Sequence, residues 1–443
     1  MSQLRPYQRA CLDAIYSHLR TRTDNPVGVI PTGGGKTHVI KQLAHDVVDQ
    51  WGGRLLILAH VKELLEQAAD KIDRDDVGIY SAGLNKKETD SPIVIAGIQS
   101  AYKKAGELGP FNIILVDEAH LIPLDGEGMY RQFLADALLV NPKVRVVGLT
   151  ATPYRLDSGT IAQSDHFLNH ICYEASIPDL IVQGYLCQVR SKAGKQKPDT
   201  TKLHRRGGEY LANEVADLMD TDKLVDAAVA EILDLTADRH SVLVFAASVA
   251  HAMHLQCRLP DSAIVTGDTP SGERARAIAE FKNHELKYLV SVNVLSVGFD
   301  APNVDAVCLL RPTLSPGLYY QQVGRGLRIH PSKTDCLVLD FAGNVRQHGP
   351  IDALNPPRPS SSGDGGEAPV KECPDCRELI LAAYTVCPEC DFTFPAPGLK
   401  HNAEADDAAV LSKDIEPEVW EVSDVFYTVH TKKDGGPDAP KTF

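Results

Sequence analysis

Short, uninterrupted apolar runs recur along this chain, and they constrain its fold more than any other feature. Before residue 155 the runs are VGVI, RLLILAH, PIVIAGI, NIILVDEAH and VRVVGLT, each followed by a more polar stretch compatible with a helix. After residue 240 the same texture returns in SVLVFAA, SAIVTG, KYLVSV, DAVCLL and CLVLD. Continuous apolar strands that alternate with helices predict parallel sheets covered on both faces. Two such sets predict two α/β domains in tandem.

Length, composition and charge agree with this organisation. The chain has 443 residues, whereas single cores stop growing at about 250 to 300 residues. A hydrophobic content of 43% and a charged content of 23% are typical of a globular protein. We expect neither a membrane span nor a signal peptide, because long apolar runs are absent from the sequence and its N-terminus is polar and basic. The formal charge of -14 argues against wholesale coating of nucleic acid but leaves a local basic track open.

A glycine-rich segment, VGVIPTGGGKT (residues 27–37), ends like a phosphate-binding loop, although the strict pattern needs glycine where this chain has Ile30. Glycines after an apolar strand let backbone N–H groups turn toward phosphate oxygens, and the following helix offers its positive end. Lys36 would reach the β and γ phosphates, and the Thr37 hydroxyl would ligate Mg²⁺. A plain glycine-rich turn is the alternative. The predicted nucleotide-binding residues of this loop are Thr32, Gly33, Gly34, Gly35, Lys36 and Thr37.

The run IILVDEAH (residues 113–120) ends in two carboxylates at the carboxyl end of a predicted strand. There Asp117 can hold Mg²⁺, and Glu118 can polarise the water that attacks the γ-phosphate, as phosphoryl transfer requires. The alternative is a strand end with ordinary solvated acids.

The order P-T-G-x-G-K-T and then D-E-A-H resembles the superfamily 2 DEAD/DEAH-box helicases, whose phosphate loop commonly begins with a residue other than glycine. The resemblance implies two tandem RecA-like domains, ATP and Mg²⁺ as ligands, and ATP hydrolysis that depends on nucleic acid. Near the start, LRPYQRACLDAI is similar to the adenine-recognising Q motif. This similarity implies that Gln8 reads the base edge with Arg5 and Tyr7 beside it, and the resemblance also assigns His120 to the nucleotide site.

Further segments occur in the order that this family shows. LILAHVKELLEQ and IVIAGIQSAY are similar to segments that touch the nucleic-acid backbone in the first domain. GLTATPYRL resembles motif III, in which Thr150 and Thr152 couple the nucleotide site to the strand-binding face. SVNVLSVGFDAPNVDAV resembles motif V, with Gly298 and Asp300 at the interdomain cleft. Taken singly, each segment reads equally as an ordinary strand, helix or buried threonine pair.

The segment QQVGRGLRIHP resembles motif VI through Gln321, Gly324, Arg325 and Arg328. Three positions apart on a helix, the two arginines would share a face, and a planar guanidinium suits the charge that develops on the γ-phosphate. Because the phosphate loop lies in the other domain, catalysis would require the domains to close. A surface ion-pair patch is the alternative for these two residues.

A basic stretch separates the two predicted domains. RSKAGKQKPDTTKLHRR (residues 190–206) holds seven basic residues against one acidic residue, and it reads equally as a solvated linker or a nucleic-acid contact. Further on, NPPRPSSSGDGGEAP is typical of a flexible tether. We expect a first domain at 1–157, an inter-domain segment at 158–220, a second domain at 221–349, a linker at 350–370, a four-cysteine module at 371–395, and an acidic tail at 396–443 that either starts an incomplete module or docks elsewhere.

Four of the ten cysteines are concentrated in CPDCRELILAAYTVCPEC, whereas the other six are scattered singly. This usage is typical of a reducing compartment with one metal site. Four thiolates fit tetrahedral Zn²⁺ with no open position, which predicts a structural zinc ribbon. An iron centre such as that of a rubredoxin, or chance pairing, is the alternative. The candidate zinc ligands are Cys373, Cys376, Cys387 and Cys390.

Together, the DEAH box, TATPYRLD, QQVGRGLR and the four cysteines resemble the RadD family of bacterial and phage-borne DNA-repair helicase-like ATPases. This resemblance implies DNA rather than RNA, a role in repair or recombination, single-strand DNA-binding protein or a recombinase as partner, and the cytoplasm of a bacterial or phage-infected cell. We expect an ATP-dependent DNA translocase or helicase. The alternative is a zinc-ribbon accessory factor whose ATPase switches its conformation without unwinding. A restriction motor would need a nuclease signature, which we do not find in the sequence.

Overall fold

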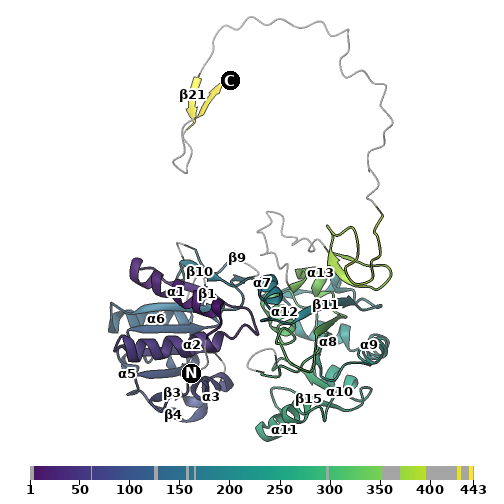
Figure 1. Cartoon of the computed structure of the whole chain (residues 1–443), viewed down its shortest axis with the longest axis horizontal. Helices are drawn as coiled ribbons and strands as arrows, with labels where there is room; N and C mark the ends of the chain where they lie inside the picture. Colours follow the sequence, from purple (N-terminus) through teal and green to yellow (C-terminus); the bar gives the residue numbers. More distant parts are fainter. Residues whose placement is uncertain are drawn as a thin grey trace, which may run out of the picture. The chain divides into compact units, whose positions relative to one another are not determined.

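The computed structural model of this chain describes residues 4–60, 62–123, 128–155, 159–163, 166–295, 299–351, 370–395, 427–430 and 439–442 (Figure 1). Its contacts divide the chain into two units, Met1–Phe394 and Pro395–Phe443. The first unit contains two large sheets and a small cysteine-bearing hairpin. In the second unit, the described residues form one antiparallel pair, β21 (Tyr427–His430) with β22 (Ala439–Thr442).

The first sheet has eight strands in the order β10-β1-β7-β6-β2-β5-β3-β4, and all neighbours are parallel except β3 and β4. Its strands are β1 (Pro26–Val29), β2 (Leu55–Ala59), β3 (Val77–Ser81), β4 (Lys86–Lys87), β5 (Ile93–Gly97), β6 (Ile113–Asp117), β7 (Arg145–Thr150) and β10 (His170–Glu174). The helices of this domain are α1 (Pro6–Thr21), α2 (Lys36–His45), α3 (Lys62–Ile72), α4 (Ile98–Ala101), α5 (Ala105–Leu108) and α6 (Met129–Val140), and a small hairpin joins β8 (Tyr154–Arg155) to β9 (Gly159–Thr160).

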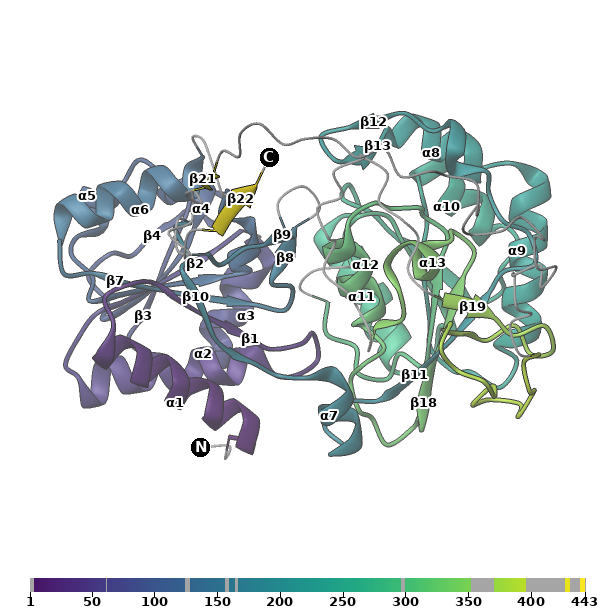
Figure 2. The same ribbon diagram turned by 90° about the horizontal axis from the view of Figure 1, so that it is seen from above.

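Both faces of this sheet are buried, which explains why its strands are apolar without interruption. Along β2, Leu55 and Ile57 pack in the same cluster as residues of α1 and α2, whereas Leu56 and Leu58 pack with residues of α5 and α6. Successive side chains of a strand point to opposite faces, so every position of a doubly covered strand has to be apolar. Figure 2 shows helices on both sides of the sheet.

The second sheet has six parallel strands in the order β11-β18-β17-β14-β16-β15. Its strands are β11 (Gln188–Ala193), β14 (Val242–Phe245), β15 (Ser262–Val265), β16 (Tyr288–Ser291), β17 (Ala306–Leu309) and β18 (Asp335–Asp340). The helices are α8 (Ala212–Met219), α9 (Asp222–Leu235), α10 (Val249–Gln256), α11 (Ser271–Lys282), α12 (Pro316–Val323) and α13 (Asn344–His348), and a hairpin joins β12 (Arg205–Arg206) to β13 (Glu209–Tyr210). The predicted α/β class with two RecA-like parallel-sheet domains is therefore confirmed.

The segment between the two predicted domains contributes a strand to each sheet. Strand β10 pairs with β1 at one edge of the first sheet, and β11 pairs with β18 at one edge of the second. A short helix, α7 (Ile177–Val182), lies between them in the sequence. Just before β11, the backbone N–H of Cys187 donates to the carbonyl of Leu327, 2.7 Å away. The connection between the domains is thus held at both ends, by β10 in the first sheet and by β11 in the second.

The cysteine-bearing hairpin pairs β19 (Val370–Glu372) with β20 (Leu379–Leu381) and packs against β11. Glu378 is 6% exposed, and one of its carboxylate oxygens accepts the backbone N–H of Ser191 at 2.8 Å. Arg377 pairs with Glu231 of α9 at 2.6 Å. The hairpin therefore covers an edge strand whose N–H and C=O groups would otherwise stay available for pairing.

Several side chains of the basic stretch serve these contacts. Arg190 pairs with Asp335 at 2.7 Å and also with Glu389, and Lys197 pairs with Glu372 at 2.7 Å. Arg190 and Lys197 are therefore not part of a free basic surface, because acids of the second sheet and of the cysteine module match their charges. Among the described residues, no helix is long and apolar enough to cross a membrane.

Candidate nucleotide-binding site

The glycine loop connects β1 to α2 and turns through two left-handed positions. Gly33 and Gly35 have φ angles of +84° and +77°, a conformation that glycine adopts without steric cost. Ile30 is fully buried below the loop, and a Cβ added to Gly34 would lie only 2.8 Å from its side chain. Ile30 thus packs against the underside of the loop, which gives an apolar residue a structural reason to stand at this position.

Lys36 begins α2 and contacts both carboxylates at the end of β6. Its ammonium lies 3.0 Å from Asp117 and 2.5 Å from Glu118. Burial lowers the pKa of Lys36, but the two carboxylates outweigh burial and hold the pKa above its ordinary value. The structure therefore brings the predicted lysine and both predicted acids together, with the lysine charge shared between the acids.

Glu118 adopts the left-handed region, with φ +53° and ψ +51°. This conformation is uncommon for a residue with a side chain and is concentrated at functional sites. Beyond it, Nδ1 of His120 lies 3.4 Å from a Glu118 oxygen, 3.0 Å from the Thr150 hydroxyl and 3.3 Å from the Thr152 hydroxyl. His120 thus connects Glu118, just after β6, to Thr150 at the end of β7 and to Thr152 beyond it.

The residues of the predicted Q motif contact the glycine loop directly. The Tyr7 hydroxyl donates to the carbonyl of Gly34 at 2.6 Å, and the Gln8 amide donates to the same carbonyl at 3.0 Å. Gln8 also accepts the backbone N–H of Arg5 at 3.0 Å. The guanidinium of Arg5 lies over the ring of Tyr185, 5.0 Å from its centroid. Tyr185 was not predicted, because no motif marks it and only the fold brings it to α1.

The two motif VI arginines come from the second domain, but not from a helix. Helix α12 ends at Val323, so Arg325 and Arg328 lie in the turns that follow it. The expectation that they share a helical face is therefore wrong. The chain turns at Gly324, where a Cβ would lie 2.6 Å from Thr32 of the glycine loop, so this backbone and the loop are in close contact.

Arg325 is 6% exposed and donates to the carbonyl of Phe299 at 2.6 Å. Burial, together with the neighbouring Arg328, lowers the pKa of Arg325 to about 9, so Arg325 stays cationic at neutral pH. Arg328 pairs with Asp300 at 2.9 Å, and burial lowers its pKa despite that partner. Both guanidinium groups are thus held in a poorly solvated position where an added anion would be favourable.

A cavity of about 440 Å³ collects these side chains from both domains. Three further basic residues line it that were not predicted, His38 and Lys41 of α2 and Lys71 of α3, and Lys71 lies 3.7 Å from Asp300. Burial and the nearby cations lower the pKa of His38. No short motif marks these three positions. The predicted residues that line the cavity are Arg5, Gln8, Thr32, Gly33, Gly35, Lys36, Thr37, Asp117, Glu118, Asp300, Gln321, Arg325 and Arg328.

Two predicted residues are not among those lining the cavity. Gly34 lies beneath the loop, and His120 lies behind Glu118. Gly298 falls outside the described residues. Positive charge dominates the lining, because three acids, Asp117, Glu118 and Asp300, face six lysines and arginines. Such a cavity matches a polyanion of nucleotide size.

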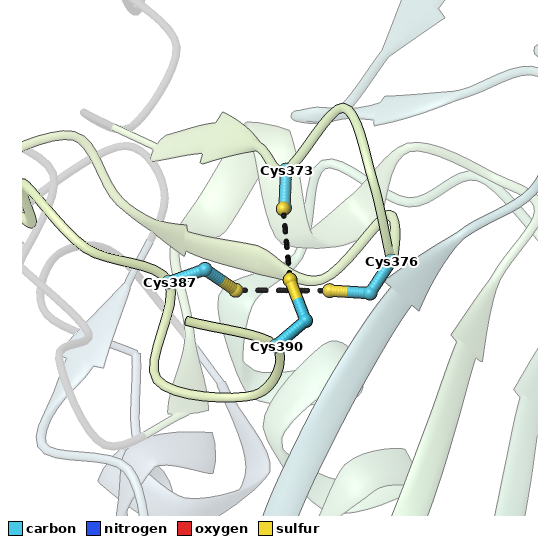
Figure 3. Close-up of side chains that lie close together, drawn as sticks. All are labelled: Cys373, Cys376, Cys387 and Cys390. Carbon is cyan, nitrogen blue, oxygen red and sulfur yellow. Dashed lines mark hydrogen bonds between the residues drawn. The ribbon is translucent and has the colours of Figure 1, made fainter. Parts of the chain in front are cut away.

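The four predicted metal ligands converge within the cysteine-bearing hairpin (Figure 3). Their sulfur atoms all lie within 4.8 Å of one another, with Cys373 and Cys390 3.5 Å apart and Cys376 and Cys387 3.6 Å apart. Four sulfur donors at this spacing fit a tetrahedral ion such as Zn²⁺.

Two RecA-like domains with a phosphate loop on one side of a shared cavity and arginines on the other are the arrangement of a helicase-type ATPase. The family models agree with that class. Residues 1–155 match the type III restriction enzyme, res subunit, and residues 224–330 match the helicase conserved C-terminal domain. Both matched segments are helicase-family domains, and they support an ATP-hydrolysing enzyme of the superfamily 2 helicase type.

Two curated relatives are informative. IRC3 of Saccharomyces cerevisiae, named as an ATP-dependent helicase, is 30% identical over 365 residues, which are 77% of this chain and 51% of that protein. A 51.5 kDa protein of a Lactococcus phage is 24% identical over 374 residues, which are 82% of this chain and 77% of that protein. The chain spans between half and three fifths of the length of the two fungal IRC3 relatives, 51% and 58%.

Solved structures share the fold. A fragment of an HsdR subunit of a type I restriction enzyme from Vibrio vulnificus has a TM-score of 0.59 and 21% identity, over 79% of this chain and 67% of that chain. The restriction-modification enzyme LlaBIII bound to DNA has a TM-score of 0.55 and 14% identity, over 77% and 28%. Dbp5 of S. cerevisiae bound to RNA and ADP BeF3 has a TM-score of 0.51 and 17% identity, over 77% and 84%.

Proposed function

We propose that this protein is an ATP-dependent DNA translocase or helicase. The observation that carries the proposal is the convergence of Lys36, Asp117 and Glu118 from the first domain with Arg325 and Arg328 from the second on a single cavity. A triphosphate in this cavity would meet cations on both sides. Its hydrolysis would therefore change the interaction between the two domains.

Each side chain has a distinct task in this proposal. Lys36 would leave its two carboxylates and bind the outer phosphates, which frees Asp117 to hold Mg²⁺ together with the Thr37 hydroxyl. Thr37 follows Lys36 directly in the first turn of α2, and Asp117 ends β6, so both oxygens belong to the cavity lining. When bound, the ion would neutralise phosphate charge. Glu118 would orient the attacking water, and Arg325 would stabilise the charge that develops on the γ-phosphate.

The assignment of DNA as the substrate, and of repair or recombination as the cellular process, rests on the resemblance to the RadD family. The same resemblance extends the proposal to single-strand DNA-binding protein or a recombinase as partner and to the cytoplasm of a bacterial or phage-infected cell. The phage relative supports this setting, whereas one fungal relative is named as mitochondrial. One solved neighbour is bound to DNA and another to RNA, so the fold supports nucleic acid of either kind.

We expect ATP hydrolysis by the purified chain to be slow alone and to rise when single-stranded or forked DNA is added. Steady-state phosphate release with single-stranded, duplex and forked DNA, and with an RNA of the same sequence, measures this. Stimulation by RNA alone would contradict the assignment to DNA, and hydrolysis that is absent under every condition would contradict the motor. Stimulation without separation of the forked strands would instead favour the accessory factor whose ATPase acts as a switch.

We also propose that the four cysteines hold a structural Zn²⁺. All four ligand positions would be filled by thiolates, which leaves no open position for catalysis. The metal would fix the turns whose neighbours, Arg377 and Glu378, contact α9 and β11. Metal occupancy would thereby stabilise the covered edge of the second sheet.

Cys376→Ser is expected to remove the zinc from the purified chain and to lower the thermal stability of the second domain. Structural zinc contributes roughly 10 kcal/mol or more to the folding of small zinc modules. Elemental analysis by mass spectrometry gives the metal content and separates zinc from iron. Cys257→Ser, at an exposed cysteine of the same domain, is the matched control and should retain the metal. Full zinc content in Cys376→Ser, or iron in place of zinc, would contradict the ribbon.

A further inference from the structure

The β12–β13 hairpin, residues 205–210, carries the last two arginines of the basic stretch, Arg205 and Arg206. In the strand register, Arg205 lies opposite Tyr210 and Arg206 lies opposite Glu209, and both arginine side chains are exposed. Within the parts of the chain that the structure describes, neither guanidinium forms an ion pair; Arg205 lies 5.9 Å above the ring of Tyr210. This contrasts with Arg190 and Lys197 of the same stretch, which pair with acids.

The hairpin tip is shaped for close approach to a ligand. Gly207 and Gly208 form the turn with φ angles of +60° and +79°, and a Cβ added to Gly207 would meet no atom within 4 Å. The turn is therefore bare, and it stands out at the upper edge of the second domain in Figure 2. A bare turn preceded by two arginines suits a phosphate backbone, because backbone N–H groups and planar guanidinium groups both bind phosphate oxygens.

The position of the hairpin relative to the six-stranded sheet supports the same ligand. The segment follows the carboxyl end of β11, and it contacts Thr313, which follows the carboxyl end of β17. Because β11, β18 and β17 are parallel neighbours, these ends share one edge of the second sheet. Ligands of open parallel sheets bind at that edge.

The opposite side of the hairpin is attached to the segment that leads to the nucleotide site. Glu209 accepts the backbone N–H of Leu314 at 2.8 Å, and its second oxygen accepts the hydroxyl of Thr313. Ser315 follows and caps α12 by accepting the N–H of Leu318 at 3.2 Å. Helix α12 then leads to Gln321 and to the two arginines of the cavity.

The first turn of α12 also lies beside the threonines of the first domain. A Cβ on Gly317 would be 3.8 Å from the Thr152 hydroxyl, which contacts His120, and His120 in turn contacts Glu118. Helix α12 therefore approaches the Thr152–His120–Glu118 contacts at one end of its sequence neighbourhood and is attached to the base of the hairpin through Thr313 and Leu314. Packed side chains and hydrogen bonds of this kind can carry coupling between distant sites.

We propose that the β12–β13 hairpin binds the phosphate backbone of the DNA strand, and that Glu209 transmits this contact to α12 and the nucleotide site. This inference rests on the proposed motor function and adds to it a contact surface and a coupling residue. The ligand is a phosphodiester backbone, which the hairpin would recognise by its charge and without regard to base sequence.

Binding of a fluorescent oligo(dT) to the full chain, titrated over a range of salt concentrations, tests the contact. Arg205→Ala with Arg206→Ala should weaken binding about tenfold at low salt and reduce the slope of log affinity against log salt by about 1.4, since each phosphate contact on a single strand contributes about 0.7. The control pair, Arg20→Ala with Lys143→Ala, removes two exposed cations near the amino end of β7 and should leave affinity and slope unchanged. Equal affinities and slopes for both pairs would overturn the proposal.

Glu209→Ala tests the coupling, because it leaves both arginines in place. We expect its oligo(dT) affinity to stay within about twofold of wild type, its basal ATP hydrolysis to be unchanged, and its stimulation by oligo(dT) to be lost. Glu209→Gln keeps the acceptor for Leu314 and should restore stimulation. Full stimulation in Glu209→Ala would overturn the coupling role. If the wild type hydrolyses no ATP even with DNA, the result contradicts the proposed motor function itself. If DNA stimulates the wild type but the arginine pair binds oligo(dT) like the control pair, the result contradicts only the role of the hairpin.

Discussion

Lys36→Ala is expected to lower kcat for ATP hydrolysis about 10³-fold, because it removes the cation that contacts the outer phosphates when their charge changes. In the structure, this ammonium lies 3.0 Å from Asp117 and 2.5 Å from Glu118. The substitution therefore also leaves two buried carboxylates close together without their counter-charge. We expect a lower thermal midpoint at neutral pH, which circular dichroism can follow beside steady-state kinetics.

Lys41→Ala is the matched control for this experiment. Lys41 lies on the same helix and lines the same cavity, but its partner is the exposed Asp73 at 3.0 Å. An exposed ion pair contributes little to stability, so the control should keep kcat within about threefold of wild type. Equal loss of activity in the two variants would mean that the cavity tolerates no change of charge anywhere, and Lys36 would then have no special role.

Arg325→Ala is expected to lower kcat by about 10³-fold or more, while the affinity for ATP changes much less. A guanidinium that approaches the γ-phosphate from the second domain acts mainly on the transition state, and such arginines contribute 10³- to 10⁵-fold. Single-turnover hydrolysis and binding of a fluorescent nucleotide separate the two quantities. Arg325→Lys should not restore the rate, because an ammonium cannot reproduce the planar, forked donor.

Asp300→Asn provides a comparison that separates the two arginines. Asp300 pairs with Arg328 at 2.9 Å and lies 3.7 Å from Lys71. We expect a smaller loss, about tenfold in kcat, because Arg328 keeps its charge and loses only its orientation. A larger loss in Asp300→Asn than in Arg325→Ala would assign the transition-state role to Arg328 instead.

The sequence predicts the central strands well because burial on both faces forces them to be apolar throughout. It does not predict β10 and β11, because edge strands of mixed exposure carry polar residues such as His170 and Arg190. The phosphate-loop and DEAH residues are predictable because each set acts from one short segment. Lys71 and Tyr185 are not, because they reach the site only through tertiary folding.

The motif VI error has a specific cause. The three-residue spacing of Arg325 and Arg328 predicts a shared face only if the segment is helical. This segment also holds two glycines, Gly324 and Gly326, at positions where the chain is closely packed. A Cβ on Gly324 would lie 2.6 Å from Thr32, and one on Gly326 would lie 2.2 Å from the sulfur of Cys336. The backbone there is fixed by what packs against it, and the helix ends before it. Residue spacing alone cannot show such contacts.

The short connection between the two sheets limits how far the two domains can separate. Strands β10 and β11 are separated by thirteen residues, six of them in α7. Even with the rest of that connection fully extended, its ends could separate by only roughly 30 Å. The Cys187 N–H also holds the far end of this connection to Leu327, which lies between Arg325 and Arg328 in the chain. The connection therefore sets an upper bound on the separation of the two sheets, and under the proposed function any such movement would act directly on the arginines of the cavity.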